Sequence, residues 1–129
     1  MRPAAMRHSE RLLKELDEEI ARRRSTIERL AGSIDAIGEF LSIAHRAGVN
    51  LRLIDPLGGD LQLSALNHAA ALRFLNAHGI KPKLLASTHR HLHYSLALPG
   101  VARAVFFVVP AHIAQAEGWE QPQRREVAA

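Results

Sequence analysis

The chain has 129 residues, of which 47% are hydrophobic, and a formal net charge of +4 at pH 7. This length supports one compact core and excludes two ordinary domains in addition to a helical arm. The absence of cysteine excludes disulfides and thiolate metal sites and makes a cytoplasmic setting the expectation, and no apolar run approaches the roughly 20 residues that cross a bilayer, so no membrane partner is expected.

The positive charge is concentrated in the middle of the chain. Residues 1–48 carry nine Lys and Arg against eight Asp and Glu, residues 49–112 carry six against two, and residues 113–129 carry two against three. Six of the eight histidines also lie in 49–112, so this region becomes more cationic below about pH 6.5, the pKa of free imidazole. An anionic partner is plausible, although the charge is modest for a dedicated DNA-binding protein.

After a disordered N-terminus over 1–8, a coiled-coil helical arm is predicted over 9–48, with Ser9 as its N-cap. Apolar residues recur in the arm at alternating steps of three and four, with Arg23 as a charged exception. The apolar positions used for pairing are Leu13, Leu16, Ile20, Ile27, Leu30, Ile34, Ile37 and Leu41. A stripe of this length is not buried by one helix alone, so we expect self-association, most simply a homodimer, although its second half has the chain's own sheet as an alternative partner.

Gly32 and Ser33 leave two forms open for the arm, one long helix or a helix hairpin. The stripe keeps its phase through Gly32 and Gly38, whereas a tight reversal normally costs a few residues of loop. One long helix ending near Gly48 is therefore favoured, and at about 1.5 Å per residue it measures on the order of 58 Å.

An α+β domain is predicted over 49–117, with the element order β-β-α-β-β-β, a small antiparallel sheet and one packed helix. A hairpin over 49–63 turns at Gly58 and Gly59, and Ser64 caps the helix, which runs to about His78. The later strands are expected over 84–87, 90–98 and 101–109, and a last helical turn over 111–117. Residues 118–129 are expected to form a disordered tail with Trp119 as its only anchor.

The last strand, 101–109, is apolar on both faces, so both faces of the sheet near it should be covered. The helix capped by Ser64 is expected to cover one face. The arm, a partner subunit or a ligand is expected to cover the other.

The candidate site lies on the strand before it. His89, His91 and His93 alternate with Arg90, Leu92 and Tyr94, so the three imidazoles should point to one side of the sheet. A two-residue turn at Pro99-Gly100 would pair His93 with Phe106 and His91 with Val108 and leave the histidines on a half-apolar surface.

Several uses of these histidines remain open. They are ordinary interface histidines, or they contact phosphate together with Arg90, or His91 and His93 hold a divalent metal if His68, His112, Asp55 or Asp60 supplies a further ligand. Metal is the only cofactor considered, and no complete ligand set follows from the spacing.

His91-Leu92-His93 also resembles the His-hydrophobe-His strand of rolling-circle nucleases, relaxases and small single-strand transposases. The resemblance implies a metal held by His91 and His93 and a tyrosine nucleophile on a separate helix. The chain's only tyrosine, Tyr94, adjoins the motif on the opposite strand face. The nucleophile is therefore missing, and a metal-dependent nuclease or hydrolase would have to use water.

The sequence thus predicts a non-enzymatic, self-associating protein that contacts nucleic acid through a basic sheet surface. The residues proposed for that surface are Lys81, Lys83, His89, Arg90, His91, His93 and Arg103. The alternatives are a protein-binding adaptor or inhibitor of another complex, and the metal-dependent enzyme based on His91 and His93.

Overall fold

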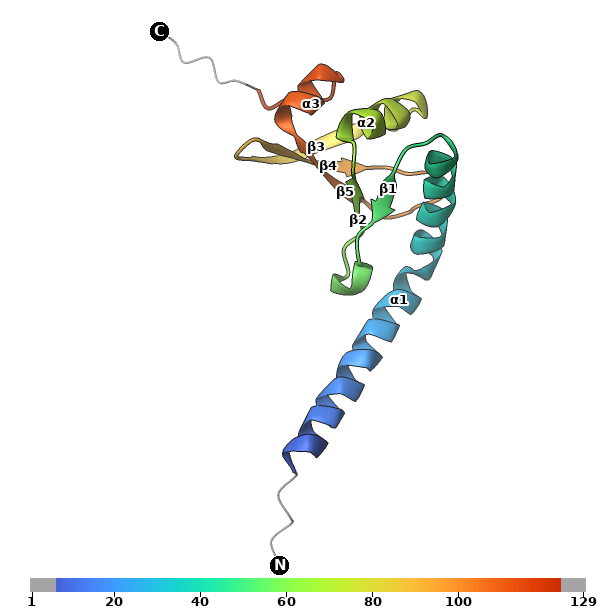
Figure 1. Cartoon of the computed structure of the whole chain (residues 1–129), viewed down its shortest axis with the longest axis vertical. Helices are drawn as coiled ribbons and strands as arrows, with labels where there is room; N and C mark the ends of the chain where they lie inside the picture. Colours follow the sequence, from blue (N-terminus) through green and yellow to red (C-terminus); the bar gives the residue numbers. More distant parts are fainter. Residues whose placement is uncertain (1–6, 124–129) are drawn as a thin grey trace, which may run out of the picture.

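In the computed structural model, which describes residues 7–123, helix α1 (His8–Arg46) leads into a sheet-based domain (Figure 1). Residues 1–6 of the expected disordered N-terminus, and residues 124–129 of the expected tail, lie outside the described residues. The prediction of one long helix is confirmed, since α1 runs without a break for 39 residues and passes through Gly32 and Gly38.

The N-cap of the helix lies two residues earlier than expected. Arg7, not Ser9, is its N-cap, and the Arg7 backbone N–H donates to the Glu10 carboxylate at 3.3 Å. At the other end Gly48, at φ 77°, donates to the carbonyl of His45, and Val49 donates to the carbonyl of Ala44. Glycine suits this position because the left-handed conformation carries no Cβ penalty there.

The sheet has five strands in the order β1-β2-β5-β4-β3. They are β1 (Leu51–Leu53), β2 (Gln62–Ala65), β3 (Pro82–Thr88), β4 (His91–Leu96) and β5 (Val105–Pro110). An α+β fold is confirmed, but the sheet is mixed and not wholly antiparallel, because β5 enters between β4 and β2 and runs parallel to β2. This pairing joins segments about 40 residues apart, and no local turn signal reports it.

The first hairpin and its following helix differ from the prediction at one cap. A 3-10 turn, η1 (Pro56–Gly58), connects β1 to β2, and Ser64 lies within β2 opposite Arg52. Helix α2 (His68–Ala77) is capped by Asn67, whose side-chain oxygen accepts from the Ala70 N–H at 3.1 Å. The expectation that Ser64 caps this helix is therefore wrong, since the strand continues through Ser64.

The register of β4 on β5 differs from the prediction by two residues. His93 pairs with Val108 and His91 with Pro110, because residues 97–104 form a longer connection than a two-residue turn. A shift by an even number keeps each side chain on its predicted face of the sheet.

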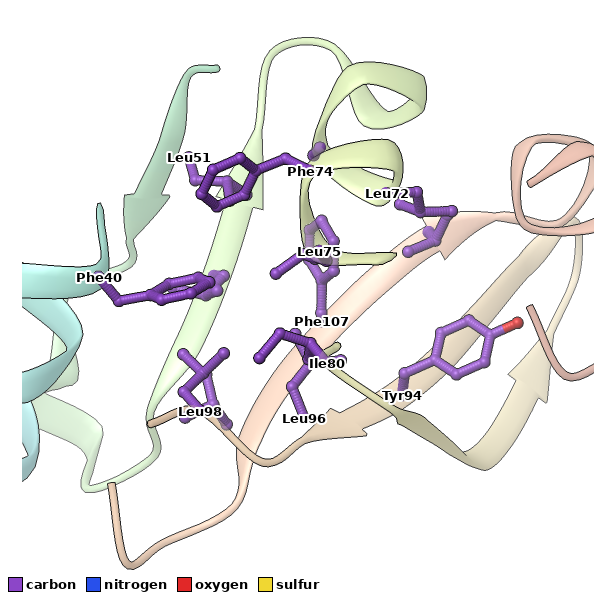
Figure 2. Packing of buried hydrophobic residues seen from close by; sticks show 14 of the residues in the cluster. Phe40, Leu51, Leu72, Phe74, Leu75, Ile80, Tyr94, Leu96, Leu98 and Phe107 are labelled. Atoms are coloured by element: carbon purple, nitrogen blue, oxygen red, sulfur yellow. The ribbon is translucent and has the colours of Figure 1, made fainter. Parts of the chain in front are cut away.

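Helices α2 and α3 (Ala111–Ala116) lie on one side of the sheet, and the second half of α1 packs beside β1 (Figure 1). The core fills the space between these helices and the sheet (Figure 2). Phe40 of α1 and Phe74 of α2 contact each other there, with ring centroids 5.5 Å apart. Leu30, Ile37 and Leu41 of the arm's apolar stripe belong to this core, and Ile34 packs against it.

The described part of the predicted tail is bound to the domain. Trp119 is buried, as an anchor should be, and its indole N–H donates to the side-chain oxygen of Asn76 at 2.7 Å. Glu120 accepts twice, through its carbonyl from the Tyr94 hydroxyl at 2.6 Å and through its carboxylate from the Leu84 N–H at 3.1 Å. Residues 118–123 thus close one end of the core, which corrects the expectation of disorder for them.

Among the described residues, no helix combines the length and the apolar character that a membrane span needs.

Candidate functional site

Within the part of the chain that the structure describes, one face of the sheet carries no helix. Side chains alternate along each strand, and those of Leu92, Tyr94 and Phe107 point into the core beneath α2 and α3. The strand pairing places the intervening residues together on the other face, which we call the open face. It comprises Arg52, Gln62, Ser64, Lys83, Ala86, Thr88, His91, His93, Ser95, Phe106 and Val108.

The open face is hollowed along its central strands. A depression of about 360 Å³ is lined by Asp60, Gln62, Leu85, Ala86, His93, Phe106, Phe107 and Val108. A second depression, of about 290 Å³, is lined by Gly59, Asp60, Leu61, Arg103, Ala104 and Phe106. The two depressions share Asp60 and Phe106 and therefore adjoin, and we call them together the trough.

His91 and His93 lie on the open face as predicted, while His89 does not belong to the strand. His89 and Arg90 form the turn between β3 and β4, and Arg90 adopts φ 64°. The His93 Nε2 is hydrogen-bonded to the Thr88 hydroxyl at 3.0 Å, and the His91 Nδ1 to the carbonyl of His89 at 3.2 Å. The surrounding strand pair therefore orients both imidazoles.

The predicted Lys and Arg residues differ in how close they lie to the trough. Lys83 lies on the open face opposite Ser95, and Arg103 lines the second depression. Lys81 is exposed immediately before β3, and Arg90 is exposed at the β3–β4 turn. The structure thus brings His91, His93, Lys83 and Arg103 to one face and leaves His89, Arg90 and Lys81 at its ends.

Acidic groups of the domain lie mostly elsewhere. Glu117 pairs with Arg73 of α2 at 3.0 Å, and Glu120 binds the backbone of Leu84. Asp60 is the acidic residue that lines the trough.

His68, the first residue of α2, lies on the helix-covered side of the sheet. It stacks on Phe107 with centroids 5.8 Å apart, and burial is the main cause that lowers its pKa below the usual value. A hydrogen bond to the Val108 backbone opposes this shift, and the nearby His91 adds to it. Protonation of His68 is therefore disfavoured in the folded chain.

Within residues 7–123, no three side chains of His, Asp or Glu converge to hold a metal ion. The proposed ligands His91 and His93 each have the other hydrogen-bond partners described above. Tyr94, on the opposite face, is fully buried and donates to a carbonyl, so it is not placed to attack a substrate on the histidine side.

The free part of the arm is the second feature with functional potential. Leu13, Leu16, Ile20 and Ile27 are all about half exposed, and Leu12 beside them is too. Arg23, the charged member of the stripe, reaches back to Glu19 at 3.0 Å, and Arg22 reaches the same carboxylate at 2.6 Å. Arg22, and then Arg23, hold the pKa of Glu19 below its usual value.

Several residues of the trough were not among the predicted site residues. Gln62 was not singled out, and Asp60 was considered only as a further metal ligand. Both come from the first hairpin, and only the non-local β2–β5 pairing brings them beside Phe106. Phe106 and Val108 had a signal, since their strand is apolar on both faces and one of those faces carries the histidines.

No family model, curated protein or solved structure matches this chain. Its function is therefore inferred from its own residues and their geometry.

Proposed function

We propose that this chain is a self-associating, non-enzymatic protein that binds single-stranded nucleic acid on the open face of its sheet. The observation that carries the proposal is a sheet face that no described helix covers, whose central strands present Phe106 near the His93 imidazole, with His91 further along the same strand.

The central strands supply stacking surfaces. Phe106 on β5 is partly exposed on the trough floor, and His93 lies on the neighbouring strand β4. Aromatic and imidazole rings on an open sheet are typical platforms for unstacked bases, and each base stacked this way contributes roughly 1–3 kcal/mol. A duplex, whose bases are already stacked, cannot use such a platform.

The edge of the trough supplies charge for the phosphates. Lys83 and Arg103 border the trough, and Arg52 lies on the same face, hydrogen-bonded to the Asn50 side chain. Lys and Arg contacts of this kind fix the backbone of a nucleic acid without reading its sequence. The small number of cations predicts modest affinity with a clear dependence on salt.

Pairing of two copies through the exposed part of the arm compensates for modest affinity per domain. The apolar stripe from Leu13 to Ile27 lies on a helix that projects away from the domain, and residues 7–123 leave it about half exposed there (Figure 1). Two linked domains bind one long strand more tightly than either alone, because the second contact is intramolecular.

The experiment is a titration of the full chain with labelled poly-dT and with duplex DNA at several salt concentrations. We expect binding to the single strand, with a logarithmic affinity that falls linearly with the logarithm of salt, and weaker binding to the duplex. Phe106→Leu, which keeps an apolar floor but removes the ring, should weaken single-strand binding by about 1–3 kcal/mol. Leu66→Ala, at an exposed position before α2, is the matched control. Equal binding by the Phe106→Leu variant and the parent would contradict the proposal.

A protein partner is the second candidate, and one observation favours it. Leu85 sits at a bulge in the edge strand β3 and is about half exposed beside the trough. An apolar side chain on an unpaired strand edge suits a peptide that adds to the sheet. Absence of any salt-dependent nucleic-acid binding, together with an affinity for peptides that Leu85→Lys abolishes, would favour this function over the first.

A further inference from the structure

We infer that the arms of two copies pair antiparallel, so that the two sheet domains stand at opposite ends of the paired helices. This inference rests on the self-association proposed above and adds its geometry. It commits the exposed stripe of the arm to one occupant, the same stripe of a second copy.

The position of the domain on its own helix argues against parallel pairing. Leu30, Ile37 and Leu41 continue the exposed stripe, and they are buried against the chain's own domain. Arg29 already lies close to Gly59 of the β1–β2 connection. In a parallel pair, the two domains would lie at the same height along the paired helices. Both would also lie on the sides of the helices that face each other, so the two domains would clash. In an antiparallel pair they are separated along the axis.

The order of charges along the arm also favours antiparallel pairing. Glu15, Asp17, Glu18 and Glu19 form an acidic block, and Arg22, Arg23 and Arg24 form a basic block after it. A parallel pair would place Arg23 on the stripe opposite its own copy, which costs Coulomb energy in a partly desolvated seam. An antiparallel pair centred between the two blocks sets acid beside base.

One register satisfies both the stripe and the charges. In this register Leu16 lies level with the partner's Ile27, and Ile20 lies level with the partner's Arg23. The stripe residues of one helix then pack between those of the other. Asp17 and Arg24, which flank the stripe, then lie beside the partner's Arg24 and the partner's Asp17. Glu19 is not needed for this contact, since Arg22 and Arg23 of the same helix already bind it.

The overlap covers the part of the arm that the domain leaves free. Leu13 lies level with the partner's Leu30, where the partner's domain begins, so residues 7–12 extend past the overlap. The two Leu30 positions are seventeen residues apart along the pair, about 26 Å at 1.5 Å per residue. The two sheets are therefore held apart, which suits two separate contacts on one extended strand.

Cysteine cross-linking tests the orientation directly, because the chain contains no cysteine of its own. We would mix copies carrying Leu16→Cys with copies carrying Ile27→Cys, oxidise them, and separate the products by mass. The antiparallel register brings these two positions level, so the mixed disulfide should dominate. In a parallel pair they are eleven residues, about 16 Å, apart, beyond disulfide reach.

Leu13→Cys is the matched control. Its two copies touch in a parallel pair and are about 26 Å apart in the antiparallel one. Efficient disulfide formation by Leu13→Cys with itself, without the mixed product above, overturns the inferred orientation and leaves self-association standing. A mass equal to one chain for the unaltered protein at micromolar concentration overturns both.

Charge reversal gives a second readout in the unoxidised protein. Asp17→Arg and Arg24→Asp should each weaken dimerisation on the order of tenfold, and the double variant should recover most of the loss. Glu18→Arg, on the outward side of the helix, should change dimerisation little. Failure of the double variant to recover, with recovery by Glu19→Arg combined with Arg24→Glu, would support parallel pairing and overturn the inference.

Discussion

At the residue scale, Tyr94 joins the end of the chain to the sheet. Its ring is fully buried against Trp119, and its hydroxyl donates to the Glu120 carbonyl. Burial, and then the Glu120 carboxylate, raise the pKa of Tyr94 to about 12. The folded chain therefore holds the phenol proton more tightly than the unfolded chain, whose tyrosine ionises near pH 10.

This shift predicts a loss of stability in alkali. The contribution is complete below about pH 10 and disappears as the pH rises through 12, amounting to roughly 2–3 kcal/mol. Urea unfolding at a series of pH values should show the decline, and phenolate absorbance, from the only tyrosine in the chain, should report the folded pKa directly. Tyr94→Phe should be less stable at pH 8 and should lose this alkaline decline. A parallel decline in Tyr94→Phe would assign it to other groups.

Under the proposed function, Arg90 contributes to binding at a cost in stability. It adopts φ 64°, which costs a residue with a Cβ about 1 kcal/mol, and its carbonyl accepts from the Ala111 N–H at 2.9 Å. Arg90→Gly should therefore raise the free energy of unfolding by roughly 0.5–1 kcal/mol and lower the affinity for single-stranded nucleic acid. Denaturant unfolding and the salt titration measure the two effects on one variant. If the variant binds as tightly as the parent, Arg90 does not contribute to the surface.

At the element scale, helix α1 divides near Leu30 into an exposed half and a half that is buried against the domain. From Leu30 onward its apolar stripe is part of the core, and before Leu30 the same stripe is exposed. The apolar residues of both halves have the same spacing in the sequence. Periodicity therefore predicted the helix but not the residue at which its apolar stripe changes from exposed to buried. That boundary depends on where the domain returns to the helix, at the connection after β1.

In the sheet, too, local sequence patterns predicted some features and missed those that depend on pairing between distant segments. Alternation in β4 correctly placed His91 and His93 on the face opposite Tyr94, and the even register shift left that result intact, although His89 lies in the turn before the strand. The parallel β2–β5 pair, and with it the position of Gln62 beside Phe106, has no local signal. Ser64 is a suitable helix cap by residue type, but β2 continues through Ser64, so α2 starts later and Asn67 caps it.

A matched pair of leucines tests the division of α1. Leu30 is 1% exposed and Leu16 is 53% exposed. Leu30→Ala should cost about 2–5 kcal/mol of unfolding free energy, because it opens a cavity in the core. Leu16→Ala should change unfolding by less than about 0.5 kcal/mol at concentrations where the chain is monomeric, and should weaken dimerisation. Calorimetry and sedimentation equilibrium separate the effects. Equal destabilisation by the two variants would show that the arm is not free.

At the scale of the whole molecule, the proposed function makes binding on the open face depend on pairing through the arm. Each domain offers one trough with few cations, so contact with a single domain should be weak. A second domain on the same particle raises the effective concentration of binding sites along a long strand, and has no such effect on an oligonucleotide that fills one trough.

Leu16→Gln combined with Ile20→Gln isolates this effect, because it removes the apolar stripe, keeps the helix-forming tendency and adds no charge. We expect a monomer whose affinity for a short oligonucleotide equals that of the parent within about twofold, since no residue of the trough is altered. Its affinity for a long strand should fall at least about tenfold, as loss of the second contact requires. Leu66→Gln, exposed outside both surfaces, should leave both affinities unchanged. Fluorescence anisotropy with oligonucleotides of increasing length measures all three proteins, and an equal loss on short and long strands would mean that the arm itself contacts the nucleic acid instead of linking two domains.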